Sequence, residues 1–153
     1  MKLILLILPN RSITNYVPKC PDALKEELSE KISQYTSVGW WVPATVHQAV
    51  LMLCVLKKNG KLQTVFDLCQ QNDNMEKDVS PFLDQDIIHH DVARAPFRSK
   101  LDMSEVYEQI RMRPEDIPKT AFVTFFGTLV SVVMQQGDCN VPSTFQRLMM
   151  VVF

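Results

Sequence analysis

The feature that most restricts the fold of this chain is a pair of apolar segments on either side of Asn59-Gly60. The first segment, QAVLMLCVL, is a continuous apolar run that predicts a buried strand, and the second, LQTVFDL, alternates apolar and polar residues as a return strand does. Because Asn-Gly is typical of the turn between antiparallel strands, the two segments predict a β-hairpin. The lysines of KKNGK would lie at its tip.

A helix is predicted upstream of this hairpin, in CPDALKEELSEKISQYTSVG. Glu27 and Lys31 lie one turn apart, where opposite charges attract, and Gly39 follows the last helical residues as a terminator does. The apolar residues at helical spacing are Leu24, Leu28, Ile32 and Tyr35. The segment is therefore expected to be one amphipathic helix.

Asp102 directly follows Leu101 at the end of a predicted buried strand, after a short helix expected around residues 84–91. An ionised carboxylate inside an apolar strand is costly unless it is paired, hydrogen-bonded or bound to a metal. Asp102 therefore either lies at the solvent-exposed end of the strand and caps the turn that follows, or has a cation as its partner. The residues around it leave both interpretations open.

The remaining third of the chain predicts a hairpin and a helix. Glu115 and Asp116, in the proline-bracketed turn RPEDIP, are expected to face solvent. TAFVTFFGTLVSVVM predicts two strands joined at Gly127, and a final helix is expected after Pro142. The apolar stripe of that helix is Phe145, Leu148, Met149 and Val152. Together the elements predict a mixed α/β fold.

Composition excludes several broad classes of function. The 153 residues are 46% hydrophobic, enough for the core of one ordinary domain, and their formal net charge of -1 gives no global attraction to nucleic acid or anionic membranes. No apolar stretch reaches the length of a membrane span. Local basic clusters either contact a partner or are solvated faces: Lys57, Lys58 and Lys61; Arg94, Arg98 and Lys100; Arg111 and Arg113.

Cysteine and histidine spacing gives no metal-site pattern. The four cysteines are scattered without a CxxC pair, which predicts neither a zinc site nor a dense disulfide framework. His89 and His90 are adjacent, so they point in different directions on any regular element. The opening MKLILLIL looks like part of a signal peptide, but its apolar run is short and no cleavage site is evident. We therefore predict an intracellular protein, in the cytoplasm or nucleus, with reduced thiols.

Three blocks of the chain resemble successive parts of the reverse transcriptase of gypsy-class LTR retrotransposons, most closely the fungal kind. They are KKNGKLQTVFDLCQQN, SKLDMSEVYEQIRMRPEDIPKTAF and MQQGDCNVPSTFQRLM. The resemblance implies part of a right-hand polymerase of α/β (α+β) class, with a fingers hairpin and an incomplete antiparallel palm sheet with packed helices. It divides the chain into a leader, 1–43, with an amphipathic helix, and a partial reverse transcriptase domain, 44–153.

The resemblance also implies roles for individual residues. LDMSEVY is similar to the first carboxylate motif of the family, so Asp102 would be the catalytic residue and a ligand of two Mg²⁺ ions. The nucleotide-binding residues would be Lys57, Glu105, Val106, Tyr107 and Gln136, with Tyr107 under the incoming sugar and the backbone amides near Glu105 and Val106 toward the triphosphate. Gly137 and Pro142 would border the template strand. The implied partners are an RNA or DNA primer-template and dNTPs.

Several positions depart from the family pattern. Gln63 and Cys69 stand where arginines are usual, and Val106 stands where alanine is usual. The second carboxylate motif, YxDD, does not occur before Phe153, and one aspartate cannot organise two ions. We therefore predict a fragment without polymerase activity of its own, which self-associates through an exposed sheet edge. The alternatives are a non-catalytic relic, a domain reused to bind nucleic acid or protein, and an unrelated structural protein.

Overall fold

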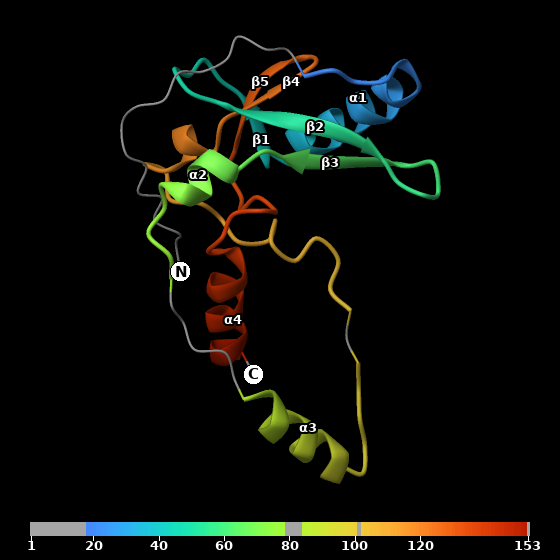
Figure 1. The fold of residues 1–153 in the computed structure, drawn as a ribbon, viewed down its shortest axis with the longest axis vertical. Coiled ribbons are helices and arrows are strands. Elements are labelled where there is room, and N and C mark those ends of the chain that lie inside the picture. Colours follow the sequence, from blue (N-terminus) through green and yellow to red (C-terminus); the bar gives the residue numbers. More distant parts are fainter. Residues whose placement is uncertain (1–17, 79–83, 101, 153) are drawn as a thin grey trace.

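The computed structural model describes residues 18–78, 84–100 and 102–152, and their arrangement is mixed α/β (Figure 1). The helices and strands, in chain order, are α1 (Asp22–Ser37), β1 (Trp41–Pro43), β2 (Val50–Leu56), β3 (Leu62–Phe66), α2 (Cys69–Asp73), α3 (Gln85–Arg94), the 3₁₀ helix η1 (Ile117–Thr120), β4 (Phe122–Thr124), β5 (Gly127–Ser131) and α4 (Val141–Val152). The predicted fold class is confirmed.

Helix α1 forms where the apolar spacing predicts it. Its buried face consists of Leu24, Leu28 and Tyr35. Asp22 lies in the first turn, where a negative charge is favourable next to the helix N-terminus. The helix ends before Gly39, whose φ of 74° is a left-handed conformation that glycine adopts without strain.

The five strands form one mixed sheet in the order β1-β5-β4-β2-β3. β2 pairs antiparallel with β3, as the hairpin prediction requires, but β2 pairs parallel with β4. The sheet is therefore not the antiparallel palm sheet that the resemblance implies. β1, from the predicted leader, pairs with β5, so the described part of that leader shares the sheet with the rest of the chain. The division at residue 43 stays a prediction.

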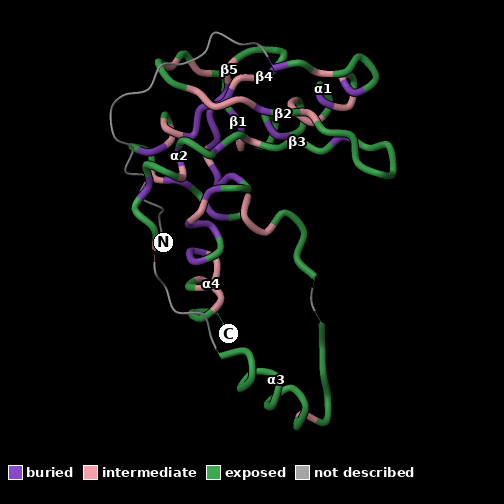
Figure 2. Tube along the Cα trace, in the orientation of Figure 1, coloured by how far each residue is buried: buried purple, intermediate pink, exposed green. Residues whose placement is uncertain are grey.

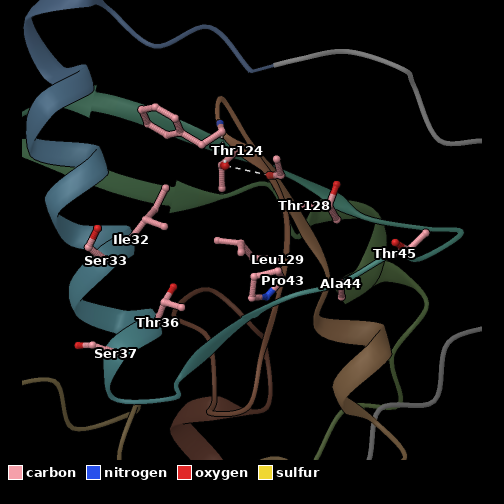
Figure 3. A pocket seen from close by; sticks show the side chains of 12 residues that line it. Ile32, Ser33, Thr36, Ser37, Pro43, Ala44, Thr45, Thr124, Thr128 and Leu129 are labelled. Atoms are coloured by element: carbon pink, nitrogen blue, oxygen red, sulfur yellow. Dashed lines mark hydrogen bonds between the residues drawn. The ribbon is translucent and has the colours of Figure 1, made fainter.

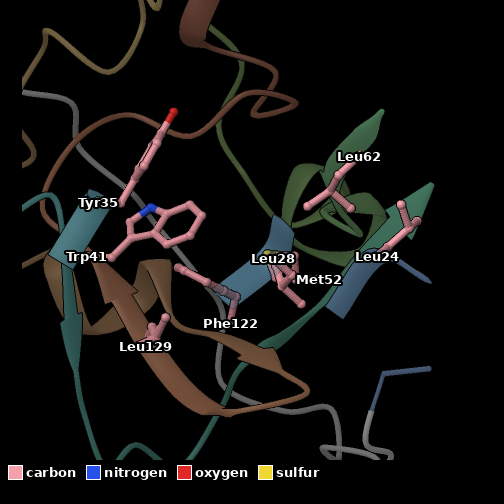
Figure 4. Packing of buried hydrophobic residues seen from close by; sticks show 8 residues of the cluster. All are labelled: Leu24, Leu28, Tyr35, Trp41, Met52, Leu62, Phe122 and Leu129. Atoms are coloured by element: carbon pink, nitrogen blue, oxygen red, sulfur yellow. The ribbon is translucent and has the colours of Figure 1, made fainter. Parts of the chain in front are cut away.

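Two groups of buried side chains hold the elements together. The first lies between α1 and the sheet, with Phe122 and Leu28 fully buried (Figure 4). The rings of Trp41 and Phe122 are 5.0 Å apart, and those of Phe66 and Phe122 are 4.8 Å apart. The second group joins the start of α4 to the neighbouring loops: it comprises Met75, Ile110, Met112, Met134 and Val141.

The hairpin differs from its prediction in two ways. Lys57 N–H donates to Lys61 O at 2.8 Å and Gly60 N–H donates to Lys57 O at 2.9 Å, which makes a three-residue loop with Gly60 left-handed. The apolar run before it is also not a buried strand, because only Met52 of β2 is buried. Met52 faces α1, whereas Leu53 and Val55 alternate onto the uncovered face and are 43% and 44% exposed.

The segment before Asp102 is not the strand that the sequence predicts. Leu101 lies outside the described residues, and its neighbours Lys100 and Asp102 are exposed and belong to no strand. The segment follows α3, which begins at the expected place with Asp84 as its N-cap. A strand needs a neighbour to pair with, and within the described sheet this segment has none.

Asp116 was also predicted wrongly. Glu115 is exposed as expected, but Asp116 is 1% exposed and its Oδ1 accepts a hydrogen bond from Lys119 Nζ at 2.6 Å. The prediction rested on the flanking prolines, which fix a turn but do not determine which side of it packs inward. Figure 2 shows that α3, in contrast, is exposed along its length.

Candidate nucleotide-binding site

The first predicted binding residue, Lys57, lies exposed where β2 enters the hairpin turn. Gln63 is exposed on the next strand and faces outward with Val65, because β3 alternates and Leu62 and Thr64 point toward α1. Cys69 begins α2, and the hydrogen bond to the Asp67 carboxylate raises the pKa of its thiol. The two arginines that the resemblance implies are thus replaced by uncharged, exposed groups.

A run of turns over residues 104–109 follows Asp102. Glu105 has a φ of 48°, and it is the one residue besides glycine with a positive φ in the described part of the chain. A left-handed residue among right-handed turn residues orients neighbouring backbone N–H groups toward one side, an arrangement that favours anions. Val106 is half-buried in this turn, and the Tyr107 ring meets Phe145 of α4 edge-on at 5.7 Å.

The loop that carries Gln136 and Gly137 is fixed by hydrogen bonds to α2. Asn72 uses both ends of its amide: Nδ2 donates to Gly137 O at 2.9 Å, and Oδ1 accepts from Cys139 N–H at 2.9 Å. Gln136 and Gly137 remain exposed. A Cβ on Gly137 would lie 3.5 Å from Leu68 Cδ1, and the φ of 102° strains any other residue there.

A second set of hydrogen bonds joins the same loop to residues 76 and 78. The side chain of Asn140 accepts from Asp78 N–H at 2.8 Å and donates to Glu76 O at 2.8 Å. Arg147 of α4 forms an ion pair with Asp78 at 2.5 Å. Pro142, which the resemblance places beside the template, is exposed in the first turn of α4. The loop is therefore held on both sides while its predicted binding face stays open.

A half-buried cation connects the hairpin with the 104–109 turn. Burial lowers the pKa of Lys31, Lys57 adds to this effect, and the negative charges of Glu108 and Glu105 oppose it. Lys31 Nζ donates to Thr64 Oγ1 at 2.8 Å. The predicted site residues Lys57 and Glu105 therefore lie around one charge on α1, although they are 48 positions apart in the sequence.

The described residues do not fit two Mg²⁺ ions. Asp102 is exposed, and no group of three or more metal-ligating side chains occurs within residues 18–78, 84–100 and 102–152. Mg²⁺ holds its waters firmly and is bound weakly by a single carboxylate. Asp102 also has no described hydrogen bond or ion pair to the other predicted site residues. The structure thus brings Tyr107, Gln136 and Gly137 onto one packed framework but does not bring Asp102 onto it.

A separate pocket of about 900 Å³ lies between α1 and the β4–β5 hairpin (Figure 3). Its lining is uncharged and rich in hydroxyl groups, including Ser33, Thr36 and Thr128. None of the residues predicted to bind nucleotide, template or metal lines it.

In the part of the chain that the structure describes, no helix is long and apolar enough to cross a membrane.

Sequence reasoning missed three kinds of residue at this site. The predicted pair of Glu27 and Lys31 is replaced by two separate contacts with β3, since Glu27 Oε2 accepts from Leu62 N–H at 2.9 Å and Lys31 reaches Thr64. Tyr35 was assigned only to the apolar stripe. The loop-fixing residues Asn72 and Asn140 carry no local signal, because their partners are distant in the sequence.

Comparison with known proteins gives the class of this fold. No family model matches the chain. In solved structures, the chain is similar to the foamy virus protease-reverse transcriptase, with a TM-score of 0.78 and 18% identity over 94% of this chain and 20% of that one. The same viral protein in complex with double-stranded DNA matches with a TM-score of 0.75 and 17% identity, over 95% of this chain and 25% of that one. The chain has the fold of part of a reverse transcriptase polymerase domain.

Sequence relatives point to the same class of protein as the solved structures. The chain is 31% identical over 118 residues to the retrovirus-related Pol polyprotein from transposon opus of Drosophila melanogaster, which covers 76% of this chain and 11% of the relative. It is 34% identical over 97 residues to Polyprotein P3 of Commelina yellow mottle virus, 63% of this chain and 5% of the relative. The chain is thus a homologue of a short segment of Pol polyproteins. The gypsy class and fungal type stay predictions.

Proposed function

We propose that this chain supplies the nucleotide-facing fingers and the first carboxylate of an RNA-directed DNA polymerase. The observation that carries the proposal is the loop fixed by Asn72, which holds the exposed Gln136 and Gly137 against α2, the helix that follows β3 in the chain. Its support is the structural match to a reverse transcriptase over 94% of the chain. Lys57, Glu105, Val106, Tyr107 and Gln136 would then contact the incoming dNTP.

The role of Asp102 in this proposal is to supply one oxygen ligand to Mg²⁺, with the remaining ligands from groups outside these 153 residues. A bound Mg²⁺ would neutralise phosphate charge during nucleotidyl transfer. Because the described residues do not assemble a cation site, the 153-residue chain by itself is proposed to have no polymerase activity. Pro142 and Gly137 would meet the template, and an RNA or DNA primer-template is the proposed partner.

Primer extension and binding together test this function. With a primed template, four dNTPs and Mg²⁺ or Mn²⁺, we expect no extension, and extension that disappears in Asp102→Ala would overturn the proposed inactivity. Fluorescence anisotropy with an RNA/DNA hybrid should show weak, sequence-independent binding that falls steeply with salt. Complete absence of binding at low salt would contradict the function itself.

A non-catalytic relic or a reused binding module is the second candidate. It is favoured by Gln63 and Cys69, which remove two positive charges from the proposed phosphate-binding surface. Submicromolar binding at physiological salt that survives replacement of Lys57 and Lys58 by alanine would favour the reused module. The proposed self-association would use one of the sheet edges, β1 or β3, and is measured by size-exclusion chromatography over a range of concentrations.

A further inference from the structure

We infer that Tyr35 of α1 is a positioning residue for an anion-binding turn at residues 104–107, because its hydroxyl holds Glu105 in a left-handed conformation. The inference rests on the proposed function, since the anion it concerns is the triphosphate of a nucleotide. Tyr35 Oη donates to Glu105 Oε1 at 3.0 Å, although the two residues are 70 positions apart.

Glu105 needs support to keep its conformation. A φ of 48° places the side chain of an ordinary residue close to its own backbone, so a free turn would relax to a right-handed shape. Glu105 is exposed, and no burial of its own side chain fixes it. The bond to Tyr35 is a charge-assisted one between a hydroxyl and a carboxylate, and it anchors the side chain at its far end.

Tyr35 itself is rigidly held. Its ring packs at 4.5 Å from Trp41 and edge-on at 5.2 Å from Trp40. In Figure 4 the ring leans on Trp41 while the hydroxyl projects away from the other labelled side chains. Burial raises the pKa of Tyr35, and the bond to Glu105 raises it further, so the phenol keeps its proton at neutral pH. It is therefore a fixed donor.

Lys31 extends the same support to the hairpin. It lies one helical turn before Tyr35, with its Nζ 5.2 Å from the Tyr35 ring centre. It donates to Thr64 on β3, and Glu108 and Glu105 attract its charge. The helix thus ties β3 and the turn to one framework, which fixes the turn relative to the strand that carries Gln63.

The experiment separates the effect of the Tyr35 hydroxyl from that of the Tyr35 ring. Tyr35→Phe keeps the aromatic packing and removes the donor, so amides 104–107 should exchange faster with solvent and affinity for inorganic tripolyphosphate should fall about tenfold, the population cost of an unsupported left-handed residue. Ser33→Ala removes a hydroxyl from the same helix on the side of the separate pocket, and should change neither quantity.

Rescue is the decisive part of the test. Glycine adopts positive φ without a side-chain anchor, so the double variant Tyr35→Phe/Glu105→Gly should regain wild-type tripolyphosphate affinity. Tyr35→Phe/Glu105→Ala should not. Equal affinity and equal exchange in wild type and Tyr35→Phe would overturn the inference. If wild type binds no tripolyphosphate but Tyr35→Phe still loosens the turn, the conformational support stands and the nucleotide function fails.

Discussion

The region between α1 and the sheet and the segment that leads to Asp102 differ in how their apolar residues are used. Around Phe122, side chains from six elements pack into one buried group. From Asp84 to Lys100 every described residue is exposed except the half-buried Ala95. Ile87 and Phe97 are 61% and 91% exposed. The region between α1 and the sheet thus completes its own packing, whereas the segment that leads to Asp102 has no such partner among the described residues (Figure 2).

The largest expected loss of stability comes from a substitution inside the packed region. Phe122→Ala removes a fully buried ring that contacts Trp41 and Phe66, and should lower the free energy of unfolding by about 3 to 5 kcal/mol. Phe97→Ala, the matched control in the exposed segment, should change it by less than about 0.5 kcal/mol. Urea denaturation followed by tryptophan fluorescence measures both. Equal losses would show that the segment is packed after all.

A smaller effect is expected where the loop that carries Gln136 and Gly137 is fixed. Asn140→Ala removes the hydrogen bonds that this side chain makes to Asp78 N–H and Glu76 O, and should cost about 1 to 3 kcal/mol. Arg147→Met removes a partly exposed ion pair and should cost about 1 kcal/mol or less. The same denaturation experiment compares them. A greater loss for Arg147→Met would contradict the role given to the loop hydrogen bonds.

Stability should also fall at alkaline pH, in part through the packed region. Burial raises the pKa of Tyr35 above its usual 10 and raises that of Cys54 to about 12. A raised pKa in the fold means that stability is full below the unfolded pKa and is lost as pH rises above it, from about pH 9 for Cys54 and pH 10 for Tyr35.

Lys31 has the opposite effect on stability. Its pKa is lowered in the fold, so it loses its charge at a lower pH than in the unfolded chain, and the cost of burying that charge disappears as pH rises. Tyr35→Phe should therefore lose less stability than wild type between pH 10 and 11, measured by urea midpoints. An unchanged slope would mean that the buried phenol does not titrate with unfolding.

The smallest effect belongs to the exposed segment. Ile88→Lys on α3 should change the free energy of unfolding, measured by urea denaturation, by no more than about 0.5 kcal/mol. The reason is that Ile88 is already 41% exposed and buries little on folding. If that face contributes to self-association, the variant should be more monomeric at high concentration. A clearly destabilised variant would instead place Ile88 in a packed environment.

The sequence predicted those elements whose signals are local. The hairpin around Asn59-Gly60, the stripe of α1 and the strand change at Gly127 each depend on neighbouring residues, and the structure confirms that these elements form, although the hairpin loop has three residues. The burial of Asp116 and the Tyr35 bond to Glu105 depend on packing between distant segments, which no spacing reports. The Asp102 strand failed as a prediction because an apolar run forms a strand only where a neighbour pairs with it.

Hydrogen exchange with and without dATP and Mg²⁺ tests most directly the proposal that the turn at residues 104–107 and the loop at Gln136 and Gly137 form one wall of a nucleotide site. We predict that dATP slows exchange at residues 104–107 and at Gln136 and Gly137, while residues 85–94 of α3 exchange equally fast in both samples. Slowed exchange only at Ser33 and Thr128 in the separate pocket, or no change anywhere, would contradict the account.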